Sequence, residues 1–204
     1  MKKFWNDRYA SDQFAYGQEP NVFFKQELDK LKKGKILLPA DGEGRNSVYA
    51  ARQGWESFAC DISIKGRGKA MKLAKDQNVD LNYSVGDFGD LTYEDQYFDA
   101  IALIYAHFPA EKKQEFHRLV DQYLKVGGRL ILEAFSKNHL QYNSKNSKVG
   151  GPKDIEMLYS VDEIKSDFSN YDFELLEEIE TDLSEGEYHI GRVSVVRFVG
   201  RKQS

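Results

Sequence analysis

The sequence predicts an α/β fold with a mostly parallel sheet that ends in an antiparallel hairpin. Short apolar runs alternate with segments of helical period over the first two thirds of the chain, which is the pattern of parallel strands joined by crossover helices. Two longer strand candidates follow, and the connection between them contains Gly186, so we expect them to pair antiparallel. The 204 residues suit a single domain, 1–204.

Five strand candidates are short, apolar and bounded by turn residues. Continuous apolar runs such as 100–104 are typical of strands that are buried on both faces. In chain order these candidates are 35–40, 57–60, 81–85, 98–105 and 129–135, and the hairpin strands are expected over 173–183 and 192–199.

Helices are expected before and between these strands. Asn21 follows Pro20 and is a favourable helix N-cap, while Ser160 and Glu163 have the spacing of a capping box. The expected helices cover 21–32, 46–53, 63–77, 110–124 and 160–168.

Two further segments are interpreted as covers for a site. The region 1–34 is expected to form an N-terminal helical lid. The polar stretch 136–153 holds four lysines and is expected to be a mobile loop, because irregular segments of this length are usually functional lids or disordered.

Composition limits the partners of the chain. It carries 33 acidic and 29 basic residues and a formal charge of −4, so it lacks the basic footprint of proteins that bind nucleic acid or a membrane surface. No run approaches the roughly 18 apolar residues of a membrane span, and no signal peptide is recognisable. The single cysteine, Cys60, fits a reducing compartment. We expect a cytoplasmic monomer or homodimer without a metal site that binds neither nucleic acid nor membrane.

The most informative segment is the glycine-rich turn that links the first strand to a helix. Gly42 and Gly44 allow a sharp bend and a close approach of the backbone to a ligand. Roughly 20 residues later the second strand ends at Asp61, where an acidic side chain would meet the hydroxyls of a ribose. Asp87 follows the third strand. Because ligands of open α/β sheets bind outside the carboxyl ends of the strands, these residues are expected at one crevice; a purely structural turn is the alternative.

These motifs resemble the class I S-adenosylmethionine-dependent methyltransferases, and within them the small tellurite-resistance-type and thiopurine-type enzymes. The likeness covers nearly the whole chain and is carried by 5–9, 16–21, 42–46 and 127–133. It implies a Rossmann-like fold with a mostly parallel seven-stranded sheet, helices on both faces and an antiparallel terminal hairpin. It also implies S-adenosylmethionine as the cofactor and a small-molecule acceptor.

The resemblance implies a set of cofactor-binding residues. Gly42 and Gly44 would line the methionine portion of the cofactor. Asp61 would hold the ribose hydroxyls, and Asp87 would hold the adenine amino group with Phe88 against the ring. The complete set is Ala40, Asp41, Gly42, Gly44, Asn46, Asp61, Ile62, Asp87, Phe88 and Tyr105.

The turn departs from the family pattern at two positions. The usual leading acid is replaced by Leu38, and the usual first glycine is replaced by Ala40. Asp41 is the nearby residue that would supply the missing negative charge for the ammonium group of the cofactor.

Three side chains are candidates for catalytic or substrate-positioning roles. His107 follows the fourth strand at the ligand-bearing edge, and its alternative is a helix-entry or surface histidine. His189 lies close to the start of the last strand, and its alternative is an exposed hairpin residue. Tyr16 belongs to an N-terminal aromatic run that would either close over the site or staple the segment to the sheet edge. Glu133, within an apolar strand, is expected in a structural ion pair, because burying an unpaired carboxylate is costly.

The sequence therefore predicts an enzyme that transfers a methyl group from S-adenosylmethionine to a small molecule such as a thiol or an oxyanion. The altered glycine turn leaves a non-catalytic S-adenosylmethionine-binding protein as an alternative. A nicotinamide-dependent oxidoreductase shares the turn and the ribose acid, but the third position of its fingerprint is here Ser47 rather than glycine or alanine.

Overall fold

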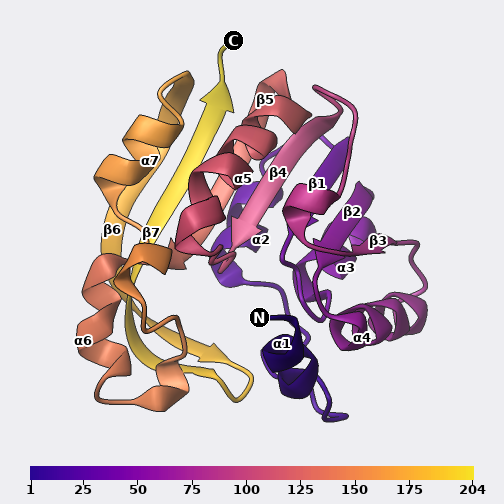
Figure 1. Ribbon diagram of the computed structural model, residues 1–204. Helices are drawn as coiled ribbons and strands as arrows, with labels where there is room; N and C mark the ends of the chain where they lie inside the picture. The colour runs from indigo at the N-terminus through magenta and orange to yellow at the C-terminus, as the bar shows by residue number, and fades with distance from the viewer.

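One seven-stranded sheet forms the centre of the molecule, in the order β3-β2-β1-β4-β5-β7-β6 (Figure 1). The computed structural model describes residues 1–204. Strands β1 to β5 pair in parallel, β7 runs antiparallel to β5, and β6 runs antiparallel to β7. The predicted fold class is confirmed. The strands are β1 (Lys35–Pro39), β2 (Glu56–Asp61), β3 (Asn82–Val85), β4 (Phe98–Ile104), β5 (Leu124–Phe135), β6 (Tyr171–Glu185) and β7 (His189–Lys202).

Helices cover both faces of this sheet. One face carries α2 (Val22–Leu28), α3 (Arg45–Arg52) and α4 (Ile64–Asp76), and the other carries α5 (Ala110–Tyr123) and α7 (Val161–Asp167). The alternation of side chains along β1 sorts the core into two layers: Leu37 packs with residues of α5 and α7, whereas Ile36 and Leu38 pack with residues of α2, α3 and α4. Both layers are closed to solvent, as the apolar runs predicted.

Two helix starts follow the expected capping chemistry. The Asn21 side chain accepts the Phe24 N–H at 2.8 Å at the start of α2. The Ser160 hydroxyl accepts the Glu163 N–H at the start of α7 and donates to the Glu163 carboxylate. Each cap satisfies an N–H that has no partner within its own helix.

Strand β5 differs from the expectation. It begins at Leu124, immediately after α5, because Leu124 already pairs with Phe98; a bulge follows, and regular pairing resumes at Arg129. The Gly127–Gly128 pair, which in sequence looks like a helix stop, lies inside the strand at this bulge. The hairpin strands are also longer than expected, because their pairing continues until Glu185 opposes His189.

Two short helices lie beyond the carboxyl ends of the parallel strands. They are α1 (Lys2–Arg8) and α6 (Leu140–Asn143), and Figure 1 shows both on the side to which the arrowhead of β4 points. Helix α6 is flanked by 3₁₀ turns at Lys137–His139 and Ser147–Val149. The polar stretch 136–153 is thus folded into short helical turns, and its mobility stays a prediction.

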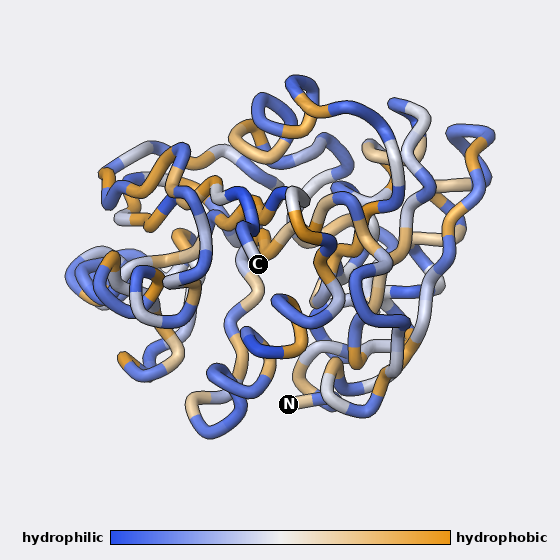
Figure 2. The backbone as a smooth tube through the Cα atoms, turned by 90° about the horizontal axis from the view of Figure 1, so that it is seen from above, coloured by the Kyte–Doolittle hydropathy of each residue, from blue (hydrophilic) through white to orange (hydrophobic).

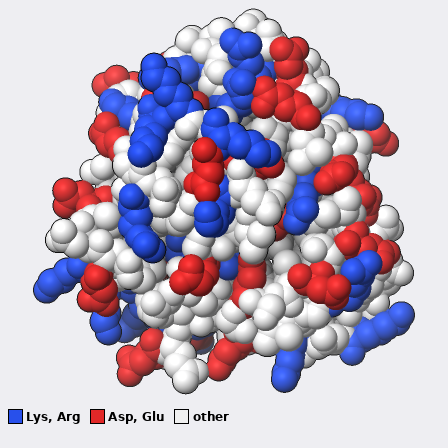
Figure 3. Space-filling model, turned by 180° about the vertical axis from the view of Figure 1, so that it is seen from behind, with Lys and Arg blue, Asp and Glu red and all other residues white.

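The outer helices are amphipathic, and the surface carries charges of both signs. Figure 2 shows hydrophilic and hydrophobic residues alternating along the outer helices, as expected for helices that bury one face. On the face seen from behind, acidic and basic side chains are interspersed and form no continuous basic track (Figure 3).

The turn between β1 and α3 depends on backbone conformations that favour glycine. Gly44, the N-cap of α3, has a φ of 87°, and a Cβ built on it would lie 2.8 Å from the Ala70 Cα. Helix α4 can therefore approach the turn only because position 44 has no side chain.

We expect Gly44→Ala to lower the free energy of unfolding by about 2 kcal/mol or more, through the left-handed φ and the overlap with α4. Gly68→Ala is the matched control. Gly68 lies within α4 with open space around it, so alanine there should stabilise the protein by about 0.5–1 kcal/mol. Urea unfolding of both variants checks this; equal effects of the two substitutions would contradict it.

Candidate active site

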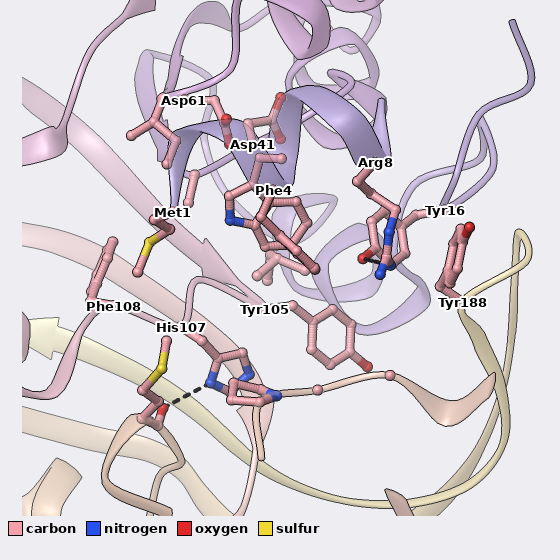
Figure 4. A pocket seen from close by; sticks show the side chains of 18 of the residues that line it. Met1, Phe4, Arg8, Tyr16, Asp41, Asp61, Tyr105, His107, Phe108 and Tyr188 are labelled. Carbon is pink, nitrogen blue, oxygen red and sulfur yellow. Dashed lines mark hydrogen bonds between the residues drawn. The ribbon is translucent and has the colours of Figure 1, made fainter. Parts of the chain in front are cut away.

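A cavity of about 640 Å³ lies beyond the carboxyl ends of the parallel strands. Each of the first five strands contributes a wall residue at its end or within two residues of it: Asp41, Asp61, Asp87, Tyr105 and Phe135. Helix α1 and the turn between β6 and β7 line the cavity from the opposite side (Figure 4). The volume is within the range of small-molecule sites. These two covers contribute Met1, Phe4, Trp5, Arg8, Tyr188 and His189.

Asp61 stands at the end of β2, with both carboxylate oxygens held by backbone groups. Oδ1 accepts the Ser63 N–H at 2.8 Å, and Oδ2 accepts the Gly42 N–H at 3.1 Å. Burial raises the pKa of Asp61 to about 6, although these hydrogen bonds act in the opposite direction. The carboxylate braces the glycine turn against β2 while facing the cavity.

Asp41 follows β1 and accepts a short hydrogen bond from the Ser47 hydroxyl. Burial is the main cause that raises the pKa of Asp41 to about 7, and the nearby charge of Asp61 adds to it. The partners of these two carboxylates are hydroxyl and backbone N–H groups, not lysine or arginine. This end of the cavity therefore favours a cationic ligand, because a positive charge would stabilise both carboxylates.

Asp87 lies in the same wall on the far side of Asp61. Its carboxylate pairs with Lys112 at 2.8 Å, and its side chain is 34% exposed. Behind it the Phe88 ring is stacked near Phe108, with 6.1 Å between the ring centroids. The structure thus brings Asp61, Ile62, Asp87 and Phe88 together in one wall.

The two glycines of the turn are placed differently from the expectation. The cavity wall includes Ala40 and Asn46 but neither Gly42 nor Gly44. A Cβ at Gly42 would lie 2.5 Å from the Tyr9 hydroxyl oxygen. Position 42 makes room for Tyr9 and position 44 makes room for α4, and the expected lining of a methionine portion by these glycines stays a prediction.

Helix α1 is fastened to this turn by its own side chains. The side-chain amide oxygen of Asn6 accepts a hydrogen bond from the Ser63 hydroxyl at 2.8 Å. Trp5 stacks on Tyr9, with 5.4 Å between the ring centroids, and Tyr9 is buried against Gly42. These contacts hold α1 across the ends of β1 and β2.

His107 lies in the wall, but both ring nitrogens are used. Nδ1 lies 2.9 Å from the Met157 carbonyl oxygen (Figure 4), and Nε2 accepts the Phe135 N–H at 3.2 Å. Since a carbonyl only accepts, Nδ1 carries the proton. Burial lowers the pKa of His107 to about 3. The expectation of a base is corrected here, because no nitrogen is free to take a proton; His107 ties the Met157 segment to β5.

Glu133 is 1% exposed and forms the structural ion pair that its sequence context indicated. Its Oε2 lies 2.6 Å from the Arg197 Nε, and its Oε1 accepts both the Asn21 amide at 2.7 Å and the Tyr105 hydroxyl at 3.0 Å. Tyr105 has a φ of 53°, and its backbone N–H also donates to the Glu133 carbonyl at 2.7 Å. These bonds hold Tyr105 at the cavity wall in an uncommon backbone conformation.

His189 lies at the opposite end of the cavity from Asp41 and Asp61, next to Glu185 and Arg45. Its Nδ1 is 3.1 Å from the Glu185 carboxylate, which also pairs with Arg45 at 2.8 Å. The hydrogen bond from His189 and the charge of Arg45 hold the pKa of Glu185 down at about 2, so the carboxylate accepts, Nδ1 donates and Nε2 of the neutral ring carries no proton. Burial lowers the pKa of His189. Nε2 has no hydrogen-bond partner and is not fully buried, and the His189 side chain lines the cavity.

Tyr16 connects the two covers. Its hydroxyl accepts the Arg8 guanidinium at 3.0 Å, and its ring centroid lies 4.5 Å from that of His189. The structure therefore brings Tyr16, His189 and Tyr105 to one end of the cavity.

Arg8, Arg45 and Glu185 are residues of the site that sequence reasoning missed. Glu185 precedes His189 by four residues, a spacing that signals contact only when the hairpin turn is known. Arg45 directly follows Gly44, where the motif drew attention to the backbone. Arg8 belongs to the N-terminal motif 5–9, but nothing in the sequence shows that its side chain enters the cavity.

No group of three or more histidine, cysteine, aspartate or glutamate side chains is arranged to hold a metal ion. None of the helices combines the length and apolarity needed to cross a membrane.

Residues 36–128, which contain β2 to β4 and the three acidic positions, are similar to the family model described as a methyltransferase domain. The match covers less than half of the chain. The predicted resemblance to methyltransferases is thereby confirmed.

Relatives and a solved structure agree with the methyltransferase domain. A demethylmenaquinone methyltransferase of Paenarthrobacter aurescens (strain TC1) is 30% identical over 105 residues, which span 50% of this chain but only 39% of that protein. A thiopurine S-methyltransferase of Legionella pneumophila (strain Corby) is 26% identical over 171 residues, covering 73% of each. The structure of TehB from Haemophilus influenzae shares the fold, with a TM-score of 0.73 and 14% identity over 99% of this chain and 67% of that chain.

The depressed pKa of His107 predicts a pH-dependent contribution to stability. Folding favours its neutral form, so its contribution is full above the unfolded pKa of about 6.5 and is lost as the pH falls toward 3. We expect His107→Gln to cost stability at pH 8 and that cost to shrink at lower pH, by up to about 1.4 kcal/mol per pH unit. The raised pKa values of Asp41 and Asp61 change the free energy of unfolding with pH in the opposite direction. They do so equally in the wild-type protein and in the variant, so they cancel in the difference.

Urea unfolding of the wild-type protein and the variant between pH 8 and pH 5 measures the difference. A difference that does not change with pH would show that His107 titrates normally.

Proposed function

We propose that this protein is an enzyme that transfers a methyl group from S-adenosylmethionine to a small-molecule acceptor. The observation that carries the proposal is the polarity of one cavity. Asp41, Asp61 and Asp87 face it from the ends of β1, β2 and β3, and an unprotonated histidine nitrogen faces it from β7. We further propose that the enzyme acts in the cytoplasm as a monomer or homodimer.

The residues at the acidic end fit the cofactor. S-adenosylmethionine supplies a methyl group bonded to a positively charged sulfur. Asp41 is placed to pair with a cationic group of it, and Asp61 is placed for ribose hydroxyls, because its oxygens retain acceptor capacity beyond the two backbone N–H groups. Phe88 and Ile62 offer apolar surface beside Asp87 for the adenine ring.

Exclusion of water is the work of α1. Methyl transfer in line from sulfur to a nucleophile depends on holding two reactants at close range, and such positioning is worth up to about 7–11 kcal/mol. Met1, Phe4 and Trp5 cover the cavity from α1, where they would shield the reacting atoms from solvent.

His189 is placed to act as the base for an acceptor that carries a proton. Nε2 would take the proton from the acceptor atom, which leaves that atom with the electron pair to accept the methyl group that S-adenosylmethionine would supply. Glu185 orients the ring through Nδ1 and stabilises the imidazolium that results. A thiolate or another preformed anion needs no such step.

Titration with S-adenosylmethionine and S-adenosylhomocysteine tests the cofactor assignment. We expect affinity to rise from pH 6 to pH 8, because the carboxyl group of Asp41, with its pKa of about 7, ionises over this range. Asp41→Asn should weaken binding about 10-fold or more at pH 8 and flatten the pH dependence. The exposed Asp12→Asn serves as the control. No binding of either compound at millimolar concentration, or binding of NADH instead, would reject the proposal.

Turnover tests the role of His189. With a panel of thiols and hydroxyl-bearing acceptors, His189→Gln should lower kcat for protonated acceptors by about 10²–10⁴-fold without changing the affinity for S-adenosylhomocysteine. Because burial keeps the pKa of His189 below its usual value, the wild-type rate should persist to pH values below about 6.5. A variant with wild-type kcat on these acceptors would remove the histidine from the mechanism. Cofactor binding without turnover of any acceptor would leave a non-catalytic protein.

A further inference from the structure

The end of the cavity around His189 carries a positive charge that the proposed methyl transfer does not use. Arg8 reaches it from the last turn of α1. Its Nη1 donates to the Tyr16 hydroxyl at 3.0 Å, which occupies one of the five N–H donors of a guanidinium. No carboxylate lies within salt-bridge distance of Arg8, unlike Arg45, which pairs with Glu185 at 2.8 Å. The other donors of Arg8 have no acceptor in the protein.

Aromatic rings fix the orientation of Arg8. The guanidinium carbon lies 3.7 Å from the centroid of the Tyr188 ring, and Figure 4 shows the group between the rings of Tyr16 and Tyr188. Such stacking restrains the plane of a guanidinium and leaves its edge available for hydrogen bonds. A planar, oriented cation of this kind suits a carboxylate, which can accept two of its N–H groups at once.

The surrounding charges favour an anion at this end. The charge of the Glu185 carboxylate is neutralised by Arg45, and His189 donates a hydrogen bond to the same carboxylate. Lys153 also lines the cavity and forms no ion pair, while the exposed Asp154 is engaged by the Glu156 N–H at 3.0 Å. Net negative charge gathers instead at the other end, at Asp41 and Asp61. One cavity thus presents unpaired acids at one end and an unpaired arginine at the other.

The walls between Arg8 and His189 are aromatic. Tyr16 contacts both, through its hydroxyl and through its ring. The Tyr105 ring centroid lies 4.5 Å from that of His189 and 4.7 Å from that of Phe135. An acceptor between Arg8 and His189 meets the ring faces and edges of Tyr16 and Tyr105, which favours a flat organic body over a bare inorganic ion.

We propose that the acceptor is an organic anion with a planar apolar body, whose carboxylate or similar oxyanion pairs with Arg8 while its nucleophilic atom faces His189 Nε2. The proposal rests on the proposed function, in which His189 marks the acceptor end. Arg8 is then the residue that selects for charge, and Tyr16 and Tyr188 are positioning residues that hold it in place.

Binding of matched probes tests this without any turnover. The three isomeric hydroxybenzoates are compared with the corresponding hydroxybenzamides, which have the same shape and no charge, using protein saturated with S-adenosylhomocysteine. We expect the best carboxylate to bind at least about 10-fold more tightly than its amide. In Arg8→Gln this preference should disappear while the amide binds as before, and Arg8→Lys should restore part of it. Lys3→Gln, an exposed change on the same helix, should leave the preference intact.

The outcomes separate the two proposals. Failure of S-adenosylhomocysteine to bind overturns the proposed function. Normal S-adenosylhomocysteine binding together with equal affinity for carboxylate and amide, a preference that survives in Arg8→Gln, or no binding of any probe at millimolar concentration overturns the anionic acceptor. Binding of sulfate that depends on Arg8, with no binding of hydroxybenzoates, overturns the planar organic body.

Discussion

The site depends on one buried amide, the side chain of Asn21. Its nitrogen donates to Glu133 at 2.7 Å and to Glu185 at 3.2 Å, and its oxygen caps α2. Glu133 belongs to β5 and Glu185 to the end of β6, so one asparagine joins the N-terminal segment, the parallel sheet and the hairpin. An amide group is suited to this junction because it is neutral and presents two donors and an acceptor. An aspartate in its place would add a third negative charge between two carboxylates.

The hydrogen bonds of Asn21 lead to two side chains of the cavity wall, Tyr105 and His189. Glu133 holds Tyr105 at the end of β4, and Glu185 holds the tautomer of His189. Each carboxylate has an arginine partner, Arg197 for Glu133 and Arg45 for Glu185, which offsets the cost of burying the charge. The geometry at the His189 end of the cavity is therefore set by two carboxylates, Glu133 and Glu185, that do not line the cavity themselves.

Most of the fold and the acidic end of the site could be predicted from the sequence. The apolar runs predicted the strands. The positions of Asp61 and Asp87 could be predicted because ligands bind at the carboxyl ends of parallel strands. The start of β5 could not be predicted, because the pairing of Leu124 with Phe98 is a contact between distant segments. Local sequence shows only a Gly127–Gly128 pair that usually ends a helix.

The roles of individual polar residues were harder to predict for the same reason. His107 and His189 look alike in sequence, each at the edge of a strand. What distinguishes them is the set of atoms around each ring: two backbone groups occupy the nitrogens of His107, whereas only one nitrogen of His189 is occupied. The roles of Glu185 and Arg8 can be recognised only from the folded structure, where the hairpin turn and α1 bring them to the site.

The attachment of α1 to the glycine turn affects how a ligand gains access to the cavity. Asn6 and Tyr9 bind the helix to the ends of β1 and β2, and its other side chains roof the cavity. Any movement of α1 away from the cavity must break the contacts that Asn6 and Tyr9 make with the turns after β1 and β2. Opening of such covers takes microseconds to milliseconds, so the packing of the glycine turn influences how readily this side of the cavity opens.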